Sequence, residues 1–201
     1  VELLVWQSTV SLSTRRMMVE YTASGISKRS ELEECFSEIL APIHENVEDL
    51  FGAGGSEKWN FGAYLYSKKL DRLIPVWRAR AATHPAVGLG REWQRGEGHV
   101  GKAFVNEEPI ITHDASHPDV APLSATPKLK QQPYDETVYR SFAAFPIGPL
   151  SPNGNPCLGV LVSTSDRVGR FDRENTDIIR HLADVLAGVT ILSHIDVDSL
   201  T

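Results

Sequence analysis

The residues Arg95-Gly96-Glu97-Gly98-His99-Val100-Gly101-Lys102-Ala103 repeat glycine after two and then three positions. A dinucleotide-binding Gly-x-Gly-x-x-Gly turn has this spacing, but it also needs a preceding strand and a following helix within a βαβ unit. Here a charged, Trp-containing segment precedes the glycines and a short strand, Pro109–Thr112, is expected to follow. We therefore predict a tight turn in which the glycines let the backbone approach the sheet closely. Such an approach also exposes backbone N–H groups to a small ligand.

An amphipathic helix is predicted upstream of this turn. Ser30 and Glu33 form a capping-box pattern, and apolar residues follow at helical spacing as far as Phe51. Pro42 is expected to kink or split the helix near Leu40, because proline removes one backbone donor. The glycines that begin at position 52 end the helix.

Strand-like segments and a closing helix complete the pattern. The segments are Trp59–Tyr66, Leu73–Thr83, Pro109–Thr112, Tyr139–Ile147 and Cys157–Ser165. Asp172 is the expected N-cap of a last helix whose apolar face reaches Leu192. The order predicts an α+β fold with an antiparallel sheet of about five or six strands, flanked by N- and C-terminal helices.

Composition excludes several classes of protein. The chain has 201 residues, 41% hydrophobic and 23% charged, with a net charge of −6 and a pI near 5.6. This acidic balance argues against a nucleic-acid binder. The two cysteines, Cys35 and Cys157, form no zinc-binding pattern and no disulfide framework, so a reducing cytoplasm is expected. No segment has the roughly 18–20 consecutive apolar residues of a membrane span.

Three regions are expected along the chain. Residues 1–29 form a linker or helical lead-in, residues 30–194 the domain, and residues 195–201 a C-terminal tail. The expected location is the cytoplasm, and attachment through the lead-in to an upstream membrane or signalling segment, as the cytoplasmic part of a longer protein, is left open as the alternative.

Five motifs in this order resemble the GAF domain family, from about Ser30 to Ser193. They are Arg95–Ala103, Pro109–Thr112 with Asp114 and Pro118, Tyr139–Ile147, Leu158–Leu161, and Phe171 before the last helix. The resemblance implies a GAF-like, PAS-like sandwich. It also implies a regulatory domain that senses a small molecule within a signal-transduction protein, and not an enzyme.

The resemblance places a ligand pocket between the sheet and the proline-rich segment from His113 to Tyr139. The candidate ligand-binding residues are His99, Val100, Asp114, Tyr134, Tyr139, Arg140 and Ser141. For Asp114 a structural role, accepting hydrogen bonds from loop N–H groups, is favoured, and Arg140 is expected to pair with it. His113 and His117 are expected to be surface residues, so no metal site is predicted.

The ligand or cofactor is left unknown. Cyclic-nucleotide-binding relatives carry an Asn-Lys pair and an Asp-Glu pair where this chain has Ser165-Asp166 and Asn175-Thr176. A covalently bound bilin needs a cysteine near the loop, and the chain has none from position 88 to 156. Both ligands are therefore disfavoured.

Two other functions stay open. The first is a ligand-free module for dimerisation or signal relay, in which Leu123, Leu129, Tyr134 and Val138 fill the pocket and apolar residues left over on the terminal helices join two copies. The second is a thiol-dependent methionine sulfoxide reductase, since one GAF branch has that activity. It is disfavoured because Cys35 and Cys157 are expected outside the pocket.

Overall fold

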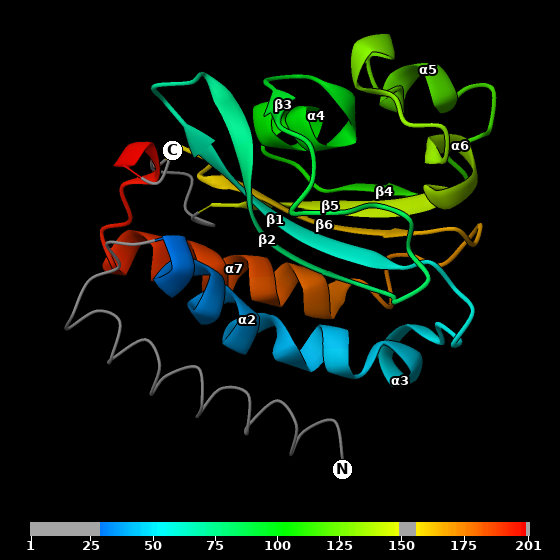
Figure 1. Ribbon diagram of the computed structural model, residues 1–201, viewed down its shortest axis with the longest axis horizontal. Coiled ribbons are helices and arrows are strands. Elements are labelled where there is room, and N and C mark those ends of the chain that lie inside the picture. Colours follow the sequence, from blue (N-terminus) through cyan, green and yellow to red (C-terminus); the bar gives the residue numbers. More distant parts are fainter. Residues whose placement is uncertain (1–28, 149–155, 200–201) are drawn as a thin grey trace.

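A six-stranded sheet forms the middle layer of the computed structural model, which describes residues 29–148 and 156–199 (Figure 1). Its strand order is β3-β2-β1-β6-β5-β4, and every neighbouring pair is antiparallel. The strands are β1 (Asn60–Ser67), β2 (Arg72–Arg80), β3 (Trp93–Gln94), β4 (Ile110–Thr112), β5 (Ser141–Ile147) and β6 (Gly159–Ser165). The predicted α+β class is confirmed, and β3 at one edge adds a strand that the sequence did not predict.

Helices cover both faces of this sheet (Figure 1). The long helices α2 (Arg29–Glu45) and α7 (Asp177–Leu192), with the short α3 (Val47–Phe51), lie on one face. The opposite face, here called the distal face, carries α4 (Gly98–Asn106), α5 (Ala121–Ser124), the 3₁₀ turn η1 (Lys128–Lys130) and α6 (Asp135–Val138). A second 3₁₀ turn, η2 (Val197–Ser199), follows α7.

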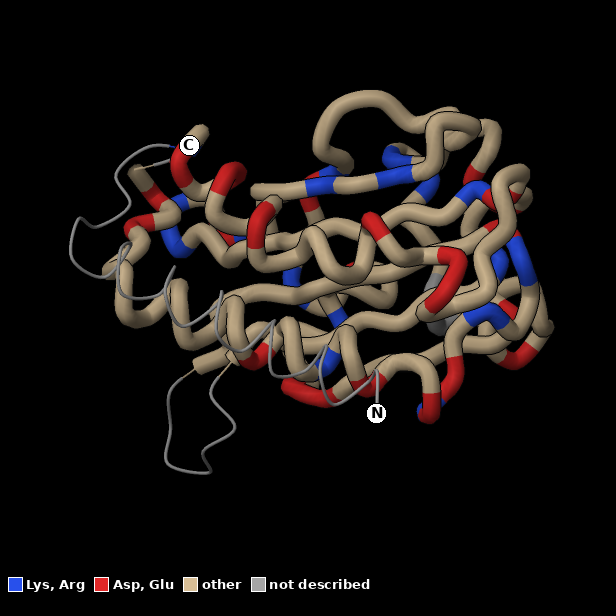
Figure 2. The backbone as a smooth tube through the Cα atoms, turned by 90° about the horizontal axis from the view of Figure 1, so that it is seen from below, with Lys and Arg blue, Asp and Glu red and all other residues tan. Residues whose placement is uncertain are grey.

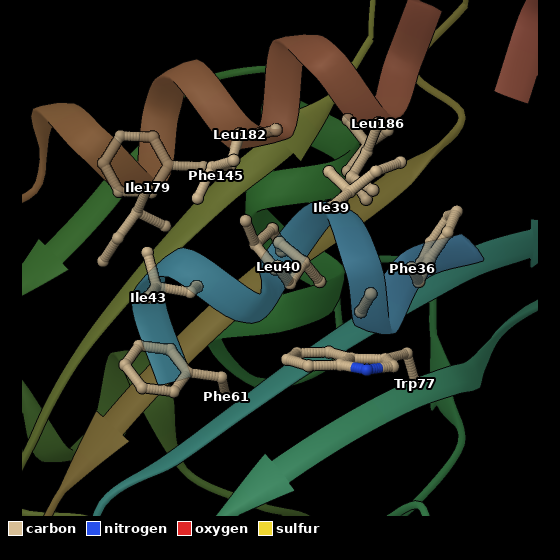
Figure 3. Close-up of a cluster of buried hydrophobic side chains, with 14 of the residues drawn as sticks. Phe36, Ile39, Leu40, Ile43, Phe61, Trp77, Phe145, Ile179, Leu182 and Leu186 are labelled. Carbon is tan, nitrogen blue, oxygen red and sulfur yellow. The ribbon is translucent and has the colours of Figure 1, made fainter. Parts of the chain in front are cut away.

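The main core lies between the sheet and the two long helices. Figure 3 shows Ile39 and Ile43 of α2 among strand residues such as Phe61 and Trp77, with Leu186 of α7 beside them. Apolar residues at helical spacing bring one face of α2 into this core. The indole N–H of Trp77 donates to Ser37 Oγ at 2.9 Å, so the one polar atom of this large side chain is satisfied.

A second, smaller core lies on the distal face. Val100, Ala103 and Phe104 of α4 pack there against Leu73, Ala144, Val160 and other strand residues. All seven residues of β6 are buried, because this strand is covered on both faces.

The glycine turn leads directly into a helix, which corrects the expectation that a strand follows it. Helix α4 begins at Gly98, and the turn closes through the Gly96 N–H, which donates to the Gly101 carbonyl at 3.0 Å. Val100, Ala103 and Phe104 of this helix lie at helical spacing and are buried. The close approach attributed to the glycines is present, since a Cβ at Gly101 would lie 2.3 Å from the Gln94 carbonyl oxygen.

Both terminal helices have boundaries other than those predicted. Ser30 lies inside α2, and the helix continues through Pro42 to Glu45. The Asn46 side chain donates to the Pro42 carbonyl at 3.0 Å, and the helix ends there. The predicted helix end is confirmed, because Gly52 takes a left-handed conformation with φ 65°.

Asp172 does not cap α7, whose N-cap is Thr176. Instead its Oδ1 accepts the backbone N–H groups of Glu174 and Asn175, each at 2.8 Å, in a turn before the helix.

Residues 195–199, predicted as part of a tail, pack against the domain. Ile195 and Val197 contact the main core. Asp198 Oδ1 accepts from the Ser67 hydroxyl at 2.6 Å and from the Lys69 N–H at 3.1 Å, which ties η2 to the β1–β2 turn. The expected lead-in lies outside the described residues for all but Arg29. Within the described ranges, no helix combines the length and apolar character of a membrane span.

Candidate functional site

Aromatic rings gather on the distal face at the end of the sheet where β5 begins. We call these residues the distal aromatic cluster: His84, Trp93, His99, Tyr134, Tyr139 and Phe142. His99 of α4 stacks on Phe142 of β5 with centroids 4.0 Å apart, and His84 lies 5.7 Å from Tyr139. The rings therefore come from five separate parts of the chain.

His84 has a buried donor with no partner. Its Nδ1 accepts the Ala86 N–H at 3.1 Å, so the neutral ring carries its proton on Nε2. That Nε2 is buried and has no hydrogen-bond partner in the described part of the chain. Burial lowers the pKa of His84 to about 4, and the charges of Arg78 and Arg80 act in the same direction. The ring is consequently neutral at pH 7.

His99 also has a buried ring nitrogen. Its Nε2 is also buried and lacks a partner among the described residues. Burial, with a smaller contribution from the charge of Arg91, lowers its pKa to about 3. The two neutral imidazoles thus lie in two ring groups, His84 with Tyr134 and Tyr139, and His99 with Trp93 and Phe142. Arg91 lies between one ring of each group, Trp93 and Tyr139.

Residues 128–139, here called the cover segment, are held over the cluster by Arg91. Its guanidinium donates to both carboxylate oxygens of Asp135, at 2.6 and 2.8 Å, and to the Lys130 carbonyl at 2.8 Å. The same guanidinium lies 5.5 Å from the Trp93 ring centre and 5.6 Å from that of Tyr139. A bidentate ion pair of this kind fixes both distance and orientation.

A second group of polar side chains borders the cluster on β1 and β2. Arg78 Nε donates to Asn60 Oδ1, and Asn60 Nδ2 donates to Thr164 Oγ1 at 3.3 Å. Arg78 and Arg80 both donate to the carbonyl of Gly88, at 3.4 and 3.0 Å.

Three of the predicted ligand-binding residues belong to the cluster: Tyr134 and Tyr139 contact each other, and His99 stacks on Phe142. Val100 is buried in the distal core. The Ser141 hydroxyl is buried and donates to the Arg167 carbonyl at 2.7 Å, so it is already satisfied.

Asp114 and Arg140 pair outside the cluster. The Arg140 Nη2 lies 3.7 Å from Asp114 Oδ1, which also accepts from the Ser116 N–H at 2.9 Å and its hydroxyl at 2.6 Å. The structural roles favoured for both residues are confirmed. Ligand binding by any of the seven candidates stays a prediction.

Sequence reasoning missed His84, Trp93, Arg78 and Arg91. The alternation of Arg78 and Arg80 with alanines places both arginines on one face of β2, and this pattern was available in the sequence. His84 follows the strand in an irregular segment, where no periodicity shows which way a side chain points.

Only some of the residues that the relay hypothesis placed inside the pocket are buried or in the cluster. Leu129 is fully exposed, whereas Val138 is buried and Tyr134 lies in the cluster. The His84, Tyr134 and Tyr139 rings contact one another, so the cover segment supplies two of the three rings around His84.

Both cysteines are buried away from the cluster. Burial raises the pKa of the Cys35 thiol to about 12 and that of Cys157 to about 11. Cys157 precedes Gly159, which pairs with Ile147, whereas the cluster lies at the Phe142 end of β5. Five residues of strand separate those ends, a span of roughly 17 Å.

Two grooves lie elsewhere on the surface. One, of about 510 Å³, is lined by residues that include Tyr66, Phe104, Cys157 and Ile191. The other, of about 580 Å³, lies between β4 and the start of α7. The described residues contain no group of three or more His, Cys, Asp or Glu side chains placed to hold a metal ion.

No family model and no curated protein matches the sequence. Solved structures do match it in fold. The GAF domain of the Acinetobacter phosphoenolpyruvate-protein phosphotransferase is 21% identical with a TM-score of 0.58, covering 92% of this chain and 94% of that one. The corresponding Coxiella burnetii domain is 18% identical with a TM-score of 0.56, covering 91% and 94%.

An enzyme shares the fold as well. The free methionine-R-sulfoxide reductase of Neisseria meningitidis, solved with its substrate, is 20% identical with a TM-score of 0.51, covering 83% of this chain and 90% of that one. The chain therefore has a GAF-like fold, as its motifs predicted. Since the fold occurs both in domains described only as GAF and in an enzyme, function has to be argued from the site.

Proposed function

We propose that the chain is a regulatory GAF domain of a signal-transduction protein and binds a small molecule in the distal aromatic cluster. The observation that carries this proposal is that His84 Nε2 and His99 Nε2 are both buried without a hydrogen-bond partner in the described part of the chain, in two ring groups that Arg91 joins. A buried polar atom without a partner costs about 1–3 kcal/mol, so each of these nitrogen atoms calls for an explanation. A ligand that hydrogen-bonds to them supplies one.

The contacts of the cover segment support a gated site. Arg91 and Asp135 join the cover segment to the segment before β3 by a bidentate, largely buried ion pair, so the position of the cover segment depends on this contact. Binding that orders or displaces this segment would change the surface offered to an output partner. That coupling would make the cluster a sensor.

We propose further that the domain is not an enzyme. A thiol reductase needs an accessible thiolate, and burial raises the pKa of both thiols well above neutrality. Neither sulfur lies in the aromatic cluster. The two free thiols also support an origin in the reducing cytoplasm.

The ligand-free relay function is the alternative, and it is supported by the contact of His84 with both Tyr134 and Tyr139. In that case His84 only fills space. Dimerisation through the terminal helices belongs to both proposals.

Native mass spectrometry of the purified chain distinguishes the sensor from the relay. We expect a noncovalent small-molecule adduct that is lost in His84→Phe, which keeps the ring but removes the N–H donor. The matched control is His181→Phe, a change at an exposed position on α7 that should keep the adduct. Circular dichroism checks that both variants fold.

If the parent chain carries no adduct, it is screened against a metabolite library by thermal shift. Absence of both an adduct and any stabilising compound would exclude the sensor and favour the relay.

A further inference from the structure

Resting on the proposed function of the cluster, we propose that its ligand is a small carboxylate with a planar apolar body. In this proposal Arg78, Arg80 and His84 bind the carboxylate, and the rings of Tyr134 and Tyr139 pack against the body.

The two arginines form a cationic pair without a carboxylate partner. They lie two residues apart on β2, and both donate to one neutral acceptor, the Gly88 carbonyl. The other partner of Arg78 is the neutral amide of Asn60. Each guanidinium has five N–H groups, so these bonds leave donors available. In the described part of the chain, neither arginine forms an ion pair.

Neighbouring cations differ in this respect. Arg91 is neutralised by Asp135, and Lys130 pairs with Glu97 at 2.5 Å. Asp166 is the carboxylate that acts electrostatically on His84, and it accepts the backbone N–H of Lys58 at 3.1 Å. The cations that act on His84 are Arg78, Arg80 and Lys58, and of these the two arginines share the Gly88 carbonyl at this border of the cluster.

His84 adds a neutral donor beside this pair. The positive charges of Arg78 and Arg80 disfavour protonation of the His84 ring. Its buried Nε2–H is unpartnered, as described above, and needs an acceptor. An anion placed between the arginines and His84 would satisfy all three side chains. A planar carboxylate matches the fork geometry of a guanidinium.

The surroundings of His84 define the rest of the ligand. Its ring lies 5.7 Å from the Tyr139 ring and 6.4 Å from the Tyr134 ring, in tilted and edge arrangements. Aromatic faces of this kind favour a flat apolar body over a flexible or strongly hydrated one. The inference is thus an aromatic or similarly planar carboxylate.

Isothermal titration calorimetry with benzoate, benzamide and inorganic phosphate tests this inference. Benzoate and benzamide have nearly the same shape and differ in charge. We expect benzoate to bind the full chain and benzamide to bind at least about tenfold more weakly, the size of a charge-assisted hydrogen bond. Phosphate, which lacks the planar body, should also bind at least about tenfold more weakly than benzoate.

Variants assign the binding to the cationic pair. Arg78→Gln and Arg80→Gln should each weaken benzoate binding about tenfold or more, whereas Arg78→Lys, which keeps the charge but not the fork, should weaken it less. Arg72→Gln is the matched control, since Arg72 lies on the same strand but pairs with Glu92 at 2.9 Å. Its affinity for benzoate should equal that of the parent, and urea unfolding checks the stability of each variant.

The remaining outcomes separate this inference from the proposed function. Equal binding of benzamide, equal binding of phosphate, or unchanged affinity in Arg78→Gln would overturn the carboxylate inference and leave a ligand-binding cluster. If a library compound binds the cluster and benzoate does not, the carboxylate inference is likewise overturned and a ligand-binding cluster remains. Failure of every compound, with no adduct in native mass spectrometry, would overturn both proposals.

Discussion

At the scale of single residues, burial determines what His84 and His99 can do. Both are held neutral at pH 7, with pKa values of about 4 and about 3. A neutral imidazole serves as a hydrogen-bond donor or acceptor, not as a counter-charge. The charge for anion binding in this cluster therefore has to come from arginine.

The depressed pKa of His84 predicts a loss of stability in acid. In the unfolded chain this histidine titrates near 6.5, whereas in the folded chain it stays neutral down to about pH 4. The unfolded state therefore binds the proton first as the pH falls through this window, and the free energy of unfolding decreases. Between pH 7.5 and pH 5 the contribution of His84 is about 2 kcal/mol.

Urea unfolding of the parent and of His84→Gln at these two pH values measures this contribution. The glutamine variant should lose about 2 kcal/mol less than the parent on acidification, because it has no proton to take up. His181→Gln, at an exposed position, should behave like the parent. An identical decrease in the parent and in His84→Gln would contradict the prediction.

At the scale of elements, the glycine turn and α4 form one unit. The turn closes through the bond from Gly96 to Gly101, and α4 then packs Val100 and Phe104 onto the sheet. His99 follows Gly98 on the first turn of the helix, so the same unit brings it to the aromatic cluster. The position of a candidate ligand contact thus depends on a backbone contact.

Gly101→Ala should destabilise the protein by at least about 2 kcal/mol. A Cβ at this position would lie 2.3 Å from the Gln94 carbonyl oxygen and 3.0 Å from the Gly96 nitrogen, both backbone atoms that cannot move without opening the turn.

The matched control is Gly54→Ala, where a Cβ would meet no atom within 4 Å. This change should alter the stability by less than about 0.5 kcal/mol. Thermal unfolding followed by circular dichroism compares the two variants, and similar melting temperatures would refute the steric role of Gly101.

At the scale of the whole molecule, the sheet is buried on both faces and few large apolar side chains remain outside. The surplus expected on the first helix is absent, because the apolar side chains of α2 lie in the main core or partly buried at its border. The helices on this side carry mainly acidic residues, drawn in red in Figure 2, with Arg29 and Arg180 as their basic residues. The end of α7 differs, since Ile191 and Leu192 are 39% and 44% exposed.

A homodimer through the terminal helices should therefore depend on the end of α7. Light scattering is expected to give twice the protomer mass of 22.2 kDa. Leu192→Asp should shift the distribution to monomer, because it places a charge in an apolar contact. Leu129→Asp is the control, as Leu129 is fully exposed on the cover segment. A monomeric parent at every concentration, or a dimer unaffected by Leu192→Asp, would contradict this prediction.

Local patterns in the sequence were enough to predict the elements and their class. Periods of about two and 3.6 residues report which side of a strand or helix is buried, and glycine marks the turns. The two long helices, five of the strands and the helix end at Gly52 could be found in this way. The ion pair of Asp114 with Arg140 also lies between residues at the ends of predicted strands.

The cluster could not be predicted in the same way, because its members come from segments that are far apart in the sequence or irregular. His84, Arg91 and Tyr139 meet only when β2, the following loop and the start of β5 are placed on one face of one sheet. The predicted helix boundaries were wrong for a related reason, since packing keeps Pro42 inside α2 although proline lacks a backbone donor. Periodicity records burial along one element, whereas contacts between elements, and the pKa values that follow from them, exist only in the folded chain.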